Sequence, residues 1–337
     1  MKGAGMRKKT GSILAEDHMI PALDEGISLH LREKRPGRLH RAGAAGTLLC
    51  VHGQSIPGAA AFDFPVPGYS WMDYMAARGF DVFALSLRGY GASTRPREMT
   101  VSPRGRPPAV RAAEAVRDVE AAARFICERR EVDGLNLLGW AQGTMLTAAY
   151  AAANPARARK LVLVSPLYLC EDPENFALFE DPARPGKLNP KLFCAWRWVT
   201  EKGQQRNWSR LIPKGREKEF REARAVRAYW REQIRHDAEG RRRRYPAVRV
   251  PNGLMADHYD RTRGKAFLDA VKVRCPALLV RAEYDLVSKD AEAQELFGAL
   301  RSSPGKRYVV LGGATHFAQY EKRRGDLFGE VQGFLES

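Results

Sequence analysis

Residues 139–143, Gly-Trp-Ala-Gln-Gly, end an apolar run and precede an alanine-rich stretch with the composition of a helix. Their spacing matches the G-x-S-x-G turn, in which a strained backbone between a strand and a helix exposes a nucleophilic serine. Here Ala141 occupies the serine position, while Gly139 and Gly143 leave room for the turn and for close packing of strand on helix. The segment therefore predicts the frame of a covalent-catalysis site without its nucleophile.

Two further side chains could move protons, and both follow apolar runs. Asp285 follows the run that begins at residue 277, and His316 follows the run that begins at residue 308. We expect His316 to act as a general base and Asp285 to fix the imidazole tautomer and stabilise the imidazolium. Asp285 could instead cap a helix that starts near Ser288, and Glu283 is the second candidate for the acid.

These residues occur in the chain order nucleophile, acid, histidine, and two other segments extend the pattern. Residues 47–54, Thr-Leu-Leu-Cys-Val-His-Gly-Gln, and 82–93, Val-Phe-Ala-Leu-Ser-Leu-Arg-Gly-Tyr-Gly-Ala-Ser, resemble strands and turns of an α/β-hydrolase. Ser86 stands where an aspartate is more common in that family, which concerns a structural turn and not the chemistry. The resemblance covers residues 24–165 and 273–337.

The resemblance implies further site residues and a fold. The backbone N–H groups of Gln54 and Gln142 would form an oxyanion hole, the latter at the positive end of a helix. His52 would brace the oxyanion loop through hydrogen bonds, and His52, Gly53 and Trp140 would lie beside the substrate. The implied fold is the α/β-hydrolase fold, a mostly parallel sheet with helices on both faces and an inserted, mostly helical cap.

The order of the predicted elements indicates one α/β core with one insertion. Strands and helices alternate up to residue 165, and the pattern of buried strands resumes only at residue 277. We expect the aromatic residues between these points to form the interior of the cap more than to contact substrate. The expected parts are a solvated N-terminal extension, a first part of the core, the helical cap and a second part of the core, at residues 1–23, 24–165, 166–272 and 273–337.

The net charge of +17 lies mostly in the predicted cap. Residues 170–276 contain 25 Lys and Arg but 15 Asp and Glu, with a peak at residues 241–244. A solvated surface explains this excess, and steering of an anionic substrate is the functional alternative. We expect no nucleic-acid partner, because no recognisable nucleic-acid-binding module accompanies the charge.

Other sequence features exclude several classes of protein. No run of eighteen apolar residues could span a membrane, and the basic start lacks the apolar stretch of a secretory signal. Five scattered cysteines indicate a reducing compartment, so we expect a cytoplasmic protein. Neither the His nor the Cys spacing suggests a metal site, and no glycine-rich nucleotide motif follows a strand, so we expect no metal and no cofactor.

Three functions remain open for a chain with this frame and Ala141. The first is a serine hydrolase present as a Ser-to-Ala inactive variant. The second is a natural, non-catalytic ligand-binding homologue. The third is a lyase or cofactor-free oxygenase that uses a His316–Asp285 dyad, since proton abstraction needs only a base and an anion-stabilising pocket.

We favour the first function, because the other parts of the site are retained. A carboxylic ester is the expected substrate bond, with amide, lactone and thioester bonds left open. Trp140 and residues 62–69 predict an apolar, aromatic-lined pocket for a small-molecule substrate, anionic or aromatic in character. The sequence makes no prediction of oligomeric state.

Overall fold

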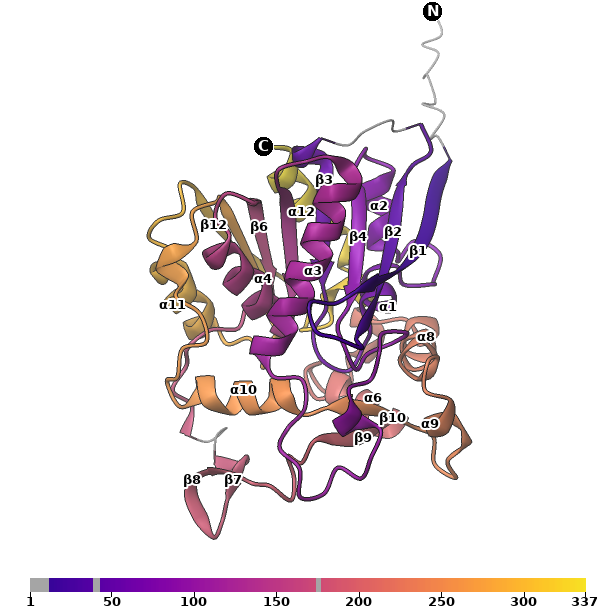
Figure 1. The fold of residues 1–337 in the computed structure, drawn as a ribbon, viewed down its shortest axis with the longest axis vertical. Coiled ribbons are helices and arrows are strands. Elements are labelled where there is room, and N and C mark those ends of the chain that lie inside the picture. Colours follow the sequence, from indigo (N-terminus) through magenta and orange to yellow (C-terminus); the bar gives the residue numbers. More distant parts are fainter. Residues whose placement is uncertain (1–11, 39–42, 174–176) are drawn as a thin grey trace, which may run out of the picture.

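The structure is a computed structural model that describes residues 12–38, 43–173 and 177–337. Its centre is one eight-stranded sheet (Figure 1). From β4 to β12 neighbouring strands run parallel, whereas β1 and β2 pair antiparallel, which confirms the predicted mostly parallel sheet. From edge to edge the strands are β1 (Ile13–Pro21), β2 (Ser28–Pro36), β4 (Asp81–Ser86), β3 (Thr47–Val51), β5 (Leu135–Trp140), β6 (Ala158–Val164), β11 (Ala277–Ala282) and β12 (Lys306–Leu311).

The edge strand β1 corrects the predicted N-terminal extension. Residues 13–21 pair with β2 along their whole length, so the expectation of a solvated segment at residues 1–23 is wrong for this part. Ile20 is its one buried side chain, and Glu16 forms ion pairs with Arg35 and Arg129. An edge strand with a charged, exposed face has a sequence like that of a loop, which explains the error. Residues 1–11 lie outside the described residues.

Alternation along the central strands places side chains against both faces of the sheet. In β3, Leu49 and Val51 belong to one apolar cluster, and Leu48 and Cys50 belong to the other. Such strands give continuous apolar runs, which is why the sequence located them. The first face is covered by α3 (Ala112–Arg130) and α4 (Gln142–Ala153), and the second by α1 (Gly58–Phe62), α2 (Trp71–Ala76) and α12 (Arg324–Glu336), while α11 (Asp290–Ala299) follows β11 (Figure 1).

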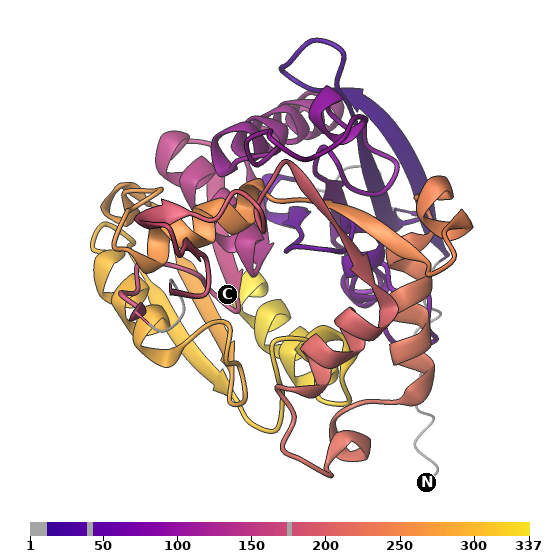
Figure 2. The ribbon, with the colours of Figure 1, turned by 90° about the horizontal axis from the view of Figure 1, so that it is seen from below.

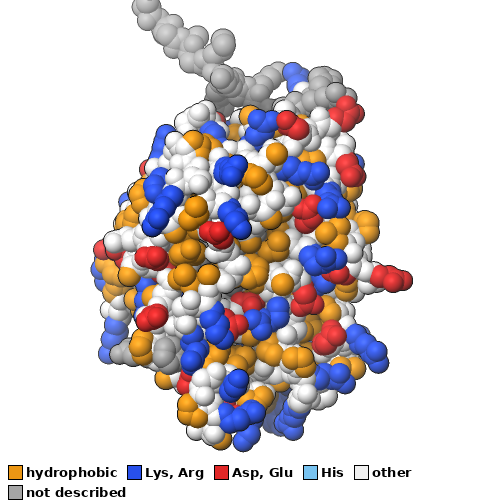
Figure 3. All heavy atoms as spheres, turned by 60° about the vertical axis from the view of Figure 1, so that its left-hand side comes forward, with side chains coloured by type: hydrophobic (Ala, Val, Ile, Leu, Met, Phe, Trp, Pro, Cys, Tyr) orange, Lys and Arg blue, Asp and Glu red, His pale blue; other side chains and the backbone are white. Residues whose placement is uncertain are grey.

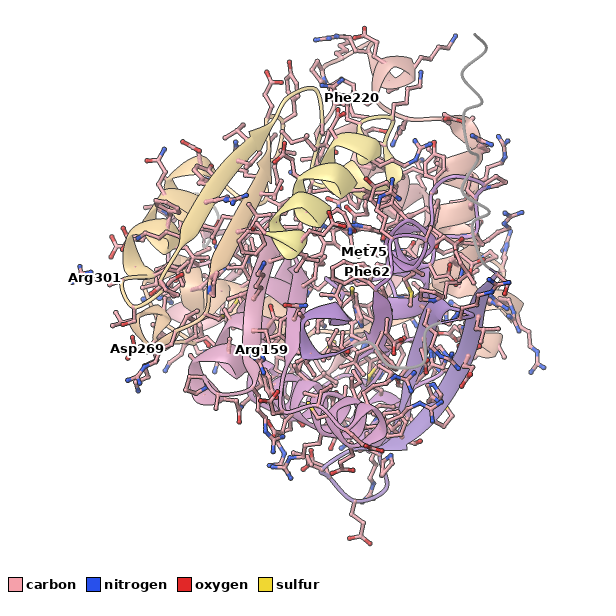
Figure 4. The ribbon with its side chains drawn as sticks, turned by 90° about the horizontal axis from the view of Figure 1, so that it is seen from above. Phe62, Met75, Arg159, Phe220, Asp269 and Arg301 are labelled. Atoms are coloured by element: carbon pink, nitrogen blue, oxygen red, sulfur yellow. The ribbon has the colours of Figure 1, made fainter. Side chains whose placement is uncertain are left out.

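Residues 62–69, which were expected to line the substrate pocket, lie in the second apolar cluster instead. Phe62 and Met75 lie near each other beside α12 in the view from above (Figure 4). Tyr69 is buried too, and the guanidinium of Arg324 stacks on its ring, 3.5 Å from the centroid. The aromatic side chains of this segment therefore pack against α2 and α12, and the prediction of a pocket here is wrong.

Residues 166–272, hereafter the inserted segment, cross the end of the sheet at which β6 ends (Figures 1 and 2). In its described part, no strand joins the eight-stranded sheet. Helices predominate, as predicted, but two small antiparallel sheets were not predicted. The elements are β7 (Glu180–Asp181), β8 (Arg184–Leu188), β9 (Trp196–Thr200), α6 (Glu201–Ser209), α7 (Glu217–Phe220), α8 (Ala223–Ile234), α9 (Ala238–Arg242), β10 (Ala247–Pro251) and α10 (Gly253–Thr262).

Trp208 of α6 attaches the inserted segment to the core. Its ring contacts Phe317 and Tyr320, with centroids 5.0 and 6.1 Å away, and it also contacts Tyr229 of α8. Its Nε1 donates a hydrogen bond to Glu321 Oε1 at 2.7 Å. Phe317 directly follows His316 in the sequence. The contact of Trp208 with Phe317 therefore packs the inserted segment against the residue next to the candidate base.

The surface mixes charges of both signs. Figure 3 shows Lys and Arg side chains interspersed with Asp and Glu and with apolar patches, without a single basic face on this side. No helix in the described ranges combines the length and the hydropathy needed to cross a bilayer.

Candidate active site

Ala141 lies in the turn between β5 and α4 in a backbone conformation that L-residues rarely adopt. Its φ is 51° and its ψ is −120°. A Cβ on Gly139 would lie 2.4 Å from the Gly143 carbonyl oxygen, and a Cβ on Gly143 would lie 2.1 Å from that of Val51. The Ala141 N–H donates to the Val164 carbonyl at 3.0 Å and ties the turn to β6. The alanine methyl group makes no hydrogen bond that could offset this strain, which costs about 1–3 kcal/mol.

Asp285 and His316 form a buried acid–base pair. His316 Nδ1 lies 2.9 Å from Asp285 Oδ2 and 3.1 Å from Oδ1, and the N–H groups of Val287 and Ser288 donate to Oδ1 at 2.8 Å each. Burial raises the pKa of Asp285, but His316, the Ser288 N–H and the Ser165 hydroxyl outweigh it and hold this pKa below its ordinary value. With Asp285 ionised, His316 donates from Nδ1, which leaves Nε2 as an acceptor.

Neighbouring groups fix the position of this pair. Trp140 Nε1 donates to the His316 carbonyl at 3.0 Å, and the two ring centroids are 5.6 Å apart. Glu283, the second candidate for the acid, accepts a hydrogen bond from the Gly313 N–H at 2.8 Å and so braces the turn that precedes His316. The structure thus brings Asp285, and not Glu283, to the imidazole.

His52 holds the loop that follows β3. Its Nδ1 donates to the Gly53 carbonyl at 2.5 Å, and its Nε2 accepts from the Leu87 N–H at 3.1 Å. Burial lowers the pKa of His52 to about 4, although the Gly53 carbonyl favours the charged form, so the ring is neutral. The side chain therefore holds the loop through hydrogen bonds that involve both ring nitrogens.

His52 and Gly53 were expected to lie beside the substrate. Neither residue lines the cavity at Ala141. His52 is fully buried and faces Leu87, and Gly53 packs against the elbow so closely that an added Cβ would lie 2.9 Å from the Ala141 Cβ. Of the three predicted pocket residues, Trp140 is the one that lines the cavity.

Gln54 and Gln142, whose backbone N–H groups are the expected oxyanion donors, both line the cavity at Ala141. Gln142 is the first residue of α4, where N–H groups have no partner within the helix and carry the positive end of its dipole. In the described part of the chain, no backbone carbonyl accepts a hydrogen bond from the Gln54 N–H. Two such donors beside the elbow can stabilise an anion that forms on the carbonyl oxygen of a bound acyl group.

The cavity has a volume of about 670 Å³, within the usual range for small-molecule sites. The core contributes Ala141, His316 and the residues beside them. Side chains of the inserted segment that were not predicted as pocket residues complete the lining, among them Phe179, Arg197, Tyr229 and His258. Their positions depend on how the inserted segment folds back over the sheet, which no local motif encodes.

One group of side chains outside the cavity has the types and proximity of metal ligands. Glu16, His18 and Glu33 lie together on β1 and β2. Glu33 Oε1 already accepts from Arg35 at 2.8 Å and from Arg130, and Glu33 Oε2 lies 2.7 Å from His18 Nε2. These partners fit a structural ion-pair network better than a cation site.

The family model described as the alpha/beta hydrolase fold matches residues 46–323 of the chain. The search of curated protein sequences found no match to this chain.

Similar solved structures cover the whole fold at low sequence identity. A thermophilic esterase from Thermogutta terrifontis has 16% identity and a TM-score of 0.62, over 95% of this chain and 98% of the esterase. The enol-lactonase from Burkholderia xenovorans LB400 has 17% identity and a TM-score of 0.61, over 96% and 100%. A mutant epoxide hydrolase from Vigna radiata has 15% identity and a TM-score of 0.59, over 96% and 97%. At these identities the likeness concerns the fold alone.

Proposed function

We propose that this chain, which belongs to the α/β-hydrolase fold family, carries the site of a serine hydrolase of carboxylic esters in a form inactivated by alanine at the nucleophile position. The strained turn at Ala141, on the same cavity as His316, supports this most directly. Backbone strain lowers the stability of the fold, and the methyl group of alanine has no chemical role that would require the strained conformation. The turn therefore fits a site built for a side chain with a hydroxyl group.

With serine at position 141, the proposed reaction is acyl transfer. The serine oxygen attacks the ester carbonyl carbon while His316 Nε2 takes its proton, and Asp285 stabilises the imidazolium. The N–H groups of Gln54 and Gln142 donate to the oxyanion. His316 returns the proton to the leaving alcohol, and a water molecule activated by the same imidazole then cleaves the acyl-enzyme.

The chain as it stands would bind an ester without cleaving it, because position 141 has no oxygen to form the acyl-enzyme. We assign residues 166–272 as a cap that completes the cavity over the core formed by residues 24–165 and 273–337. All five cysteines are free, which supports a reducing compartment such as the cytoplasm.

The test is Ala141→Ser. The variant should hydrolyse p-nitrophenyl acetate and should be labelled covalently by a fluorophosphonate probe, whereas the unmodified chain should do neither. Ala149→Ser is the matched control, because it adds a hydroxyl on the helix that follows position 141, at a residue that does not line the cavity.

Two outcomes would replace the proposal. A correctly folded Ala141→Ser variant that is neither labelled nor active would favour the non-catalytic ligand-binding homologue. Turnover by the unmodified chain that disappears in His316→Ala would favour the dyad as a lyase or a cofactor-free oxygenase.

A further inference from the structure

β9 presents one arginine to the cavity. In residues 196–200, Trp-Arg-Trp-Val-Thr, Trp198 pairs across the strands with Arg249 of β10. The Arg249 guanidinium lies over the rings of Trp196 and Trp198, 5.8 and 5.6 Å from their centroids. Successive side chains of a strand point to opposite faces, so Arg197 and Trp198 lie on different faces of this small sheet, and both residues contribute to the lining of the cavity.

The partners of Arg197 differ from those of a buried arginine in the core. Arg197 Nη1 donates to Asn252 Oδ1 at 2.5 Å, and among the described residues no carboxylate forms an ion pair with its guanidinium. Arg88, in contrast, binds Asp118 through Nε at 2.9 Å and Nη2 at 2.6 Å. Burial lowers the pKa of Arg197, whereas for Arg88 the carboxylates outweigh burial and raise the pKa.

An arginine stays protonated at neutral pH even when burial lowers its pKa. A cation that protein atoms surround without a counter-charge costs free energy, and a bound anion would recover that cost. Arg197 is half-buried as a residue because part of it faces the cavity, so an anion can reach it from there.

The described lining of the cavity has a surplus of positive charge. Its cations are Arg197, Arg210 and Lys289, and its acid is Asp172, which pairs with Lys289 at 2.6 Å. Arg210 donates from Nε to the amide oxygen of Asn207 at 3.0 Å. No lining carboxylate in these ranges is therefore available to neutralise Arg197.

We propose that Arg197 binds a carboxylate group of the substrate, so that the site selects esters that also carry one free carboxylate. The cleavage of the ester rests on the proposed function, but the binding of the carboxylate does not. Asn252 occupies only Nη1, which leaves Nε and Nη2, an edge of the guanidinium that can form two parallel hydrogen bonds to a carboxylate. Arg210 is exposed to solvent, so Arg197 is the one partly buried cation of the described lining without a carboxylate partner. A single such cation matches a carboxylate monoanion better than a phosphate dianion.

The binding test uses the unmodified chain, because Ala141 prevents turnover. Calorimetric titration compares the monoethyl esters of succinic, glutaric and adipic acids with the corresponding diethyl esters. At least one monoester should bind more tightly than its diester. Arg197→Met should weaken binding of that monoester by about 10- to 100-fold, as loss of charge-assisted hydrogen bonds does, and should leave diester binding within about two-fold.

Two further variants control for charge and for folding. Arg243→Met removes the same charge from an exposed residue that does not line the cavity, although its guanidinium lies 4.3 Å from the Trp198 centroid, and it should bind the monoester normally. Arg197→Lys keeps the charge without the planar pair of donors and should give an intermediate loss. Arg197→Met should retain the melting temperature of the parent, because it removes a cation that lacks an ion-pair partner.

Hydrolysis by the Ala141→Ser variant separates this inference from the proposed function. Its kcat/KM should favour the monoester over the diester, and adding Arg197→Met should remove this preference while diester hydrolysis continues. If the serine variant is inactive but the unmodified chain binds monoesters through Arg197, the proposed function fails and the carboxylate site stands. If the serine variant cleaves both esters equally with or without Arg197, the proposed function stands and the carboxylate site fails.

Several results would overturn the carboxylate site. They are equal binding of monoesters and diesters, unchanged monoester affinity in both Arg197 variants, and no monoester binding at millimolar concentration. Displacement of the monoester by inorganic phosphate at a lower concentration than by acetate would show that the site prefers a phosphate group instead.

Discussion

The two walls of the cavity are built in different ways. On the wall from the eight-stranded sheet, the backbone of short turns sets the geometry, and at Gly143 no Cβ fits. On the wall from the inserted segment, side chains such as Arg197 and Tyr229 project from β9 and α8. We assign bond chemistry to the first wall, because it needs fixed geometry. We assign recognition to the second, because its side chains can change without rebuilding a strained turn.

The walls also differ in how their charges are compensated. On the first wall, the carboxylate of Asp285 has the His316 imidazole and the N–H groups of Val287 and Ser288 as partners. On the second, Arg197 has an amide oxygen as its partner and no ion pair within the described residues. A charge that already has partners in the protein keeps the same arrangement before and after a ligand binds. A buried cation without a counter-charge instead gains favourable interaction energy when an anionic ligand binds.

The largest expected effect tests this division on the first wall. In the Ala141→Ser variant, His316→Ala should lower kcat by about 10³-fold or more, because the general base is lost. Steady-state kinetics with p-nitrophenyl acetate measures this. His258→Ala, which removes an imidazole from the second wall, is the control and should change KM more than kcat. Equal losses of kcat in the two variants would contradict the assignment of bond chemistry to the first wall alone.

A smaller effect concerns the pH dependence of stability on the first wall. The pKa of His52 is about 4 in the folded chain against an ordinary value of 6.5, because burial disfavours the charged ring. Between these values the unfolded chain binds a proton that the folded chain does not. Stability therefore falls as the pH drops from 6.5 to 4, by roughly 3 kcal/mol from this residue.

Replacing the ring removes this dependence. His52→Asn should be less stable than the parent at pH 7, and the difference in free energy of unfolding should shrink as the pH falls toward 4. Urea denaturation at several pH values measures both curves. A difference that stays constant across this range would contradict the neutral, buried state of His52.

The smallest expected effect concerns the exposed arginines of the inserted segment. Residues 241–244 carry four arginines, and none of them lines the cavity. In the serine variant, replacing all four with glutamine should change kcat/KM for a monoester less than about two-fold at physiological salt, because exposed charges are screened within about 8 Å at that ionic strength. A salt dependence that is steep for the monoester, flat for the diester and lost with these arginines would show steering of the substrate.

Much of the fold and of the first wall could be predicted because their signals are local. Strands buried on both faces give continuous apolar runs, and the two glycines around Ala141 mark a turn that admits nothing larger. The sequence missed β1 because an edge strand gains its hydrogen bonds from β2 and its ion pairs from α3, not from its own apolar content. Residues 62–69 were misassigned because aromatic composition does not distinguish a pocket from a core.

The amino-acid sequence by itself determined the parallel part of the sheet, the turn at Ala141 and the two strand ends that carry Asp285 and His316. The tertiary structure alone decided that Asp285 and not Glu283 faces the imidazole, that His52 lies behind the loop, and that Arg197 faces the cavity. The physical reason is distance along the chain. Turns and strands depend on neighbouring residues, whereas a cavity wall and its charge balance arise where segments far apart in sequence pack together.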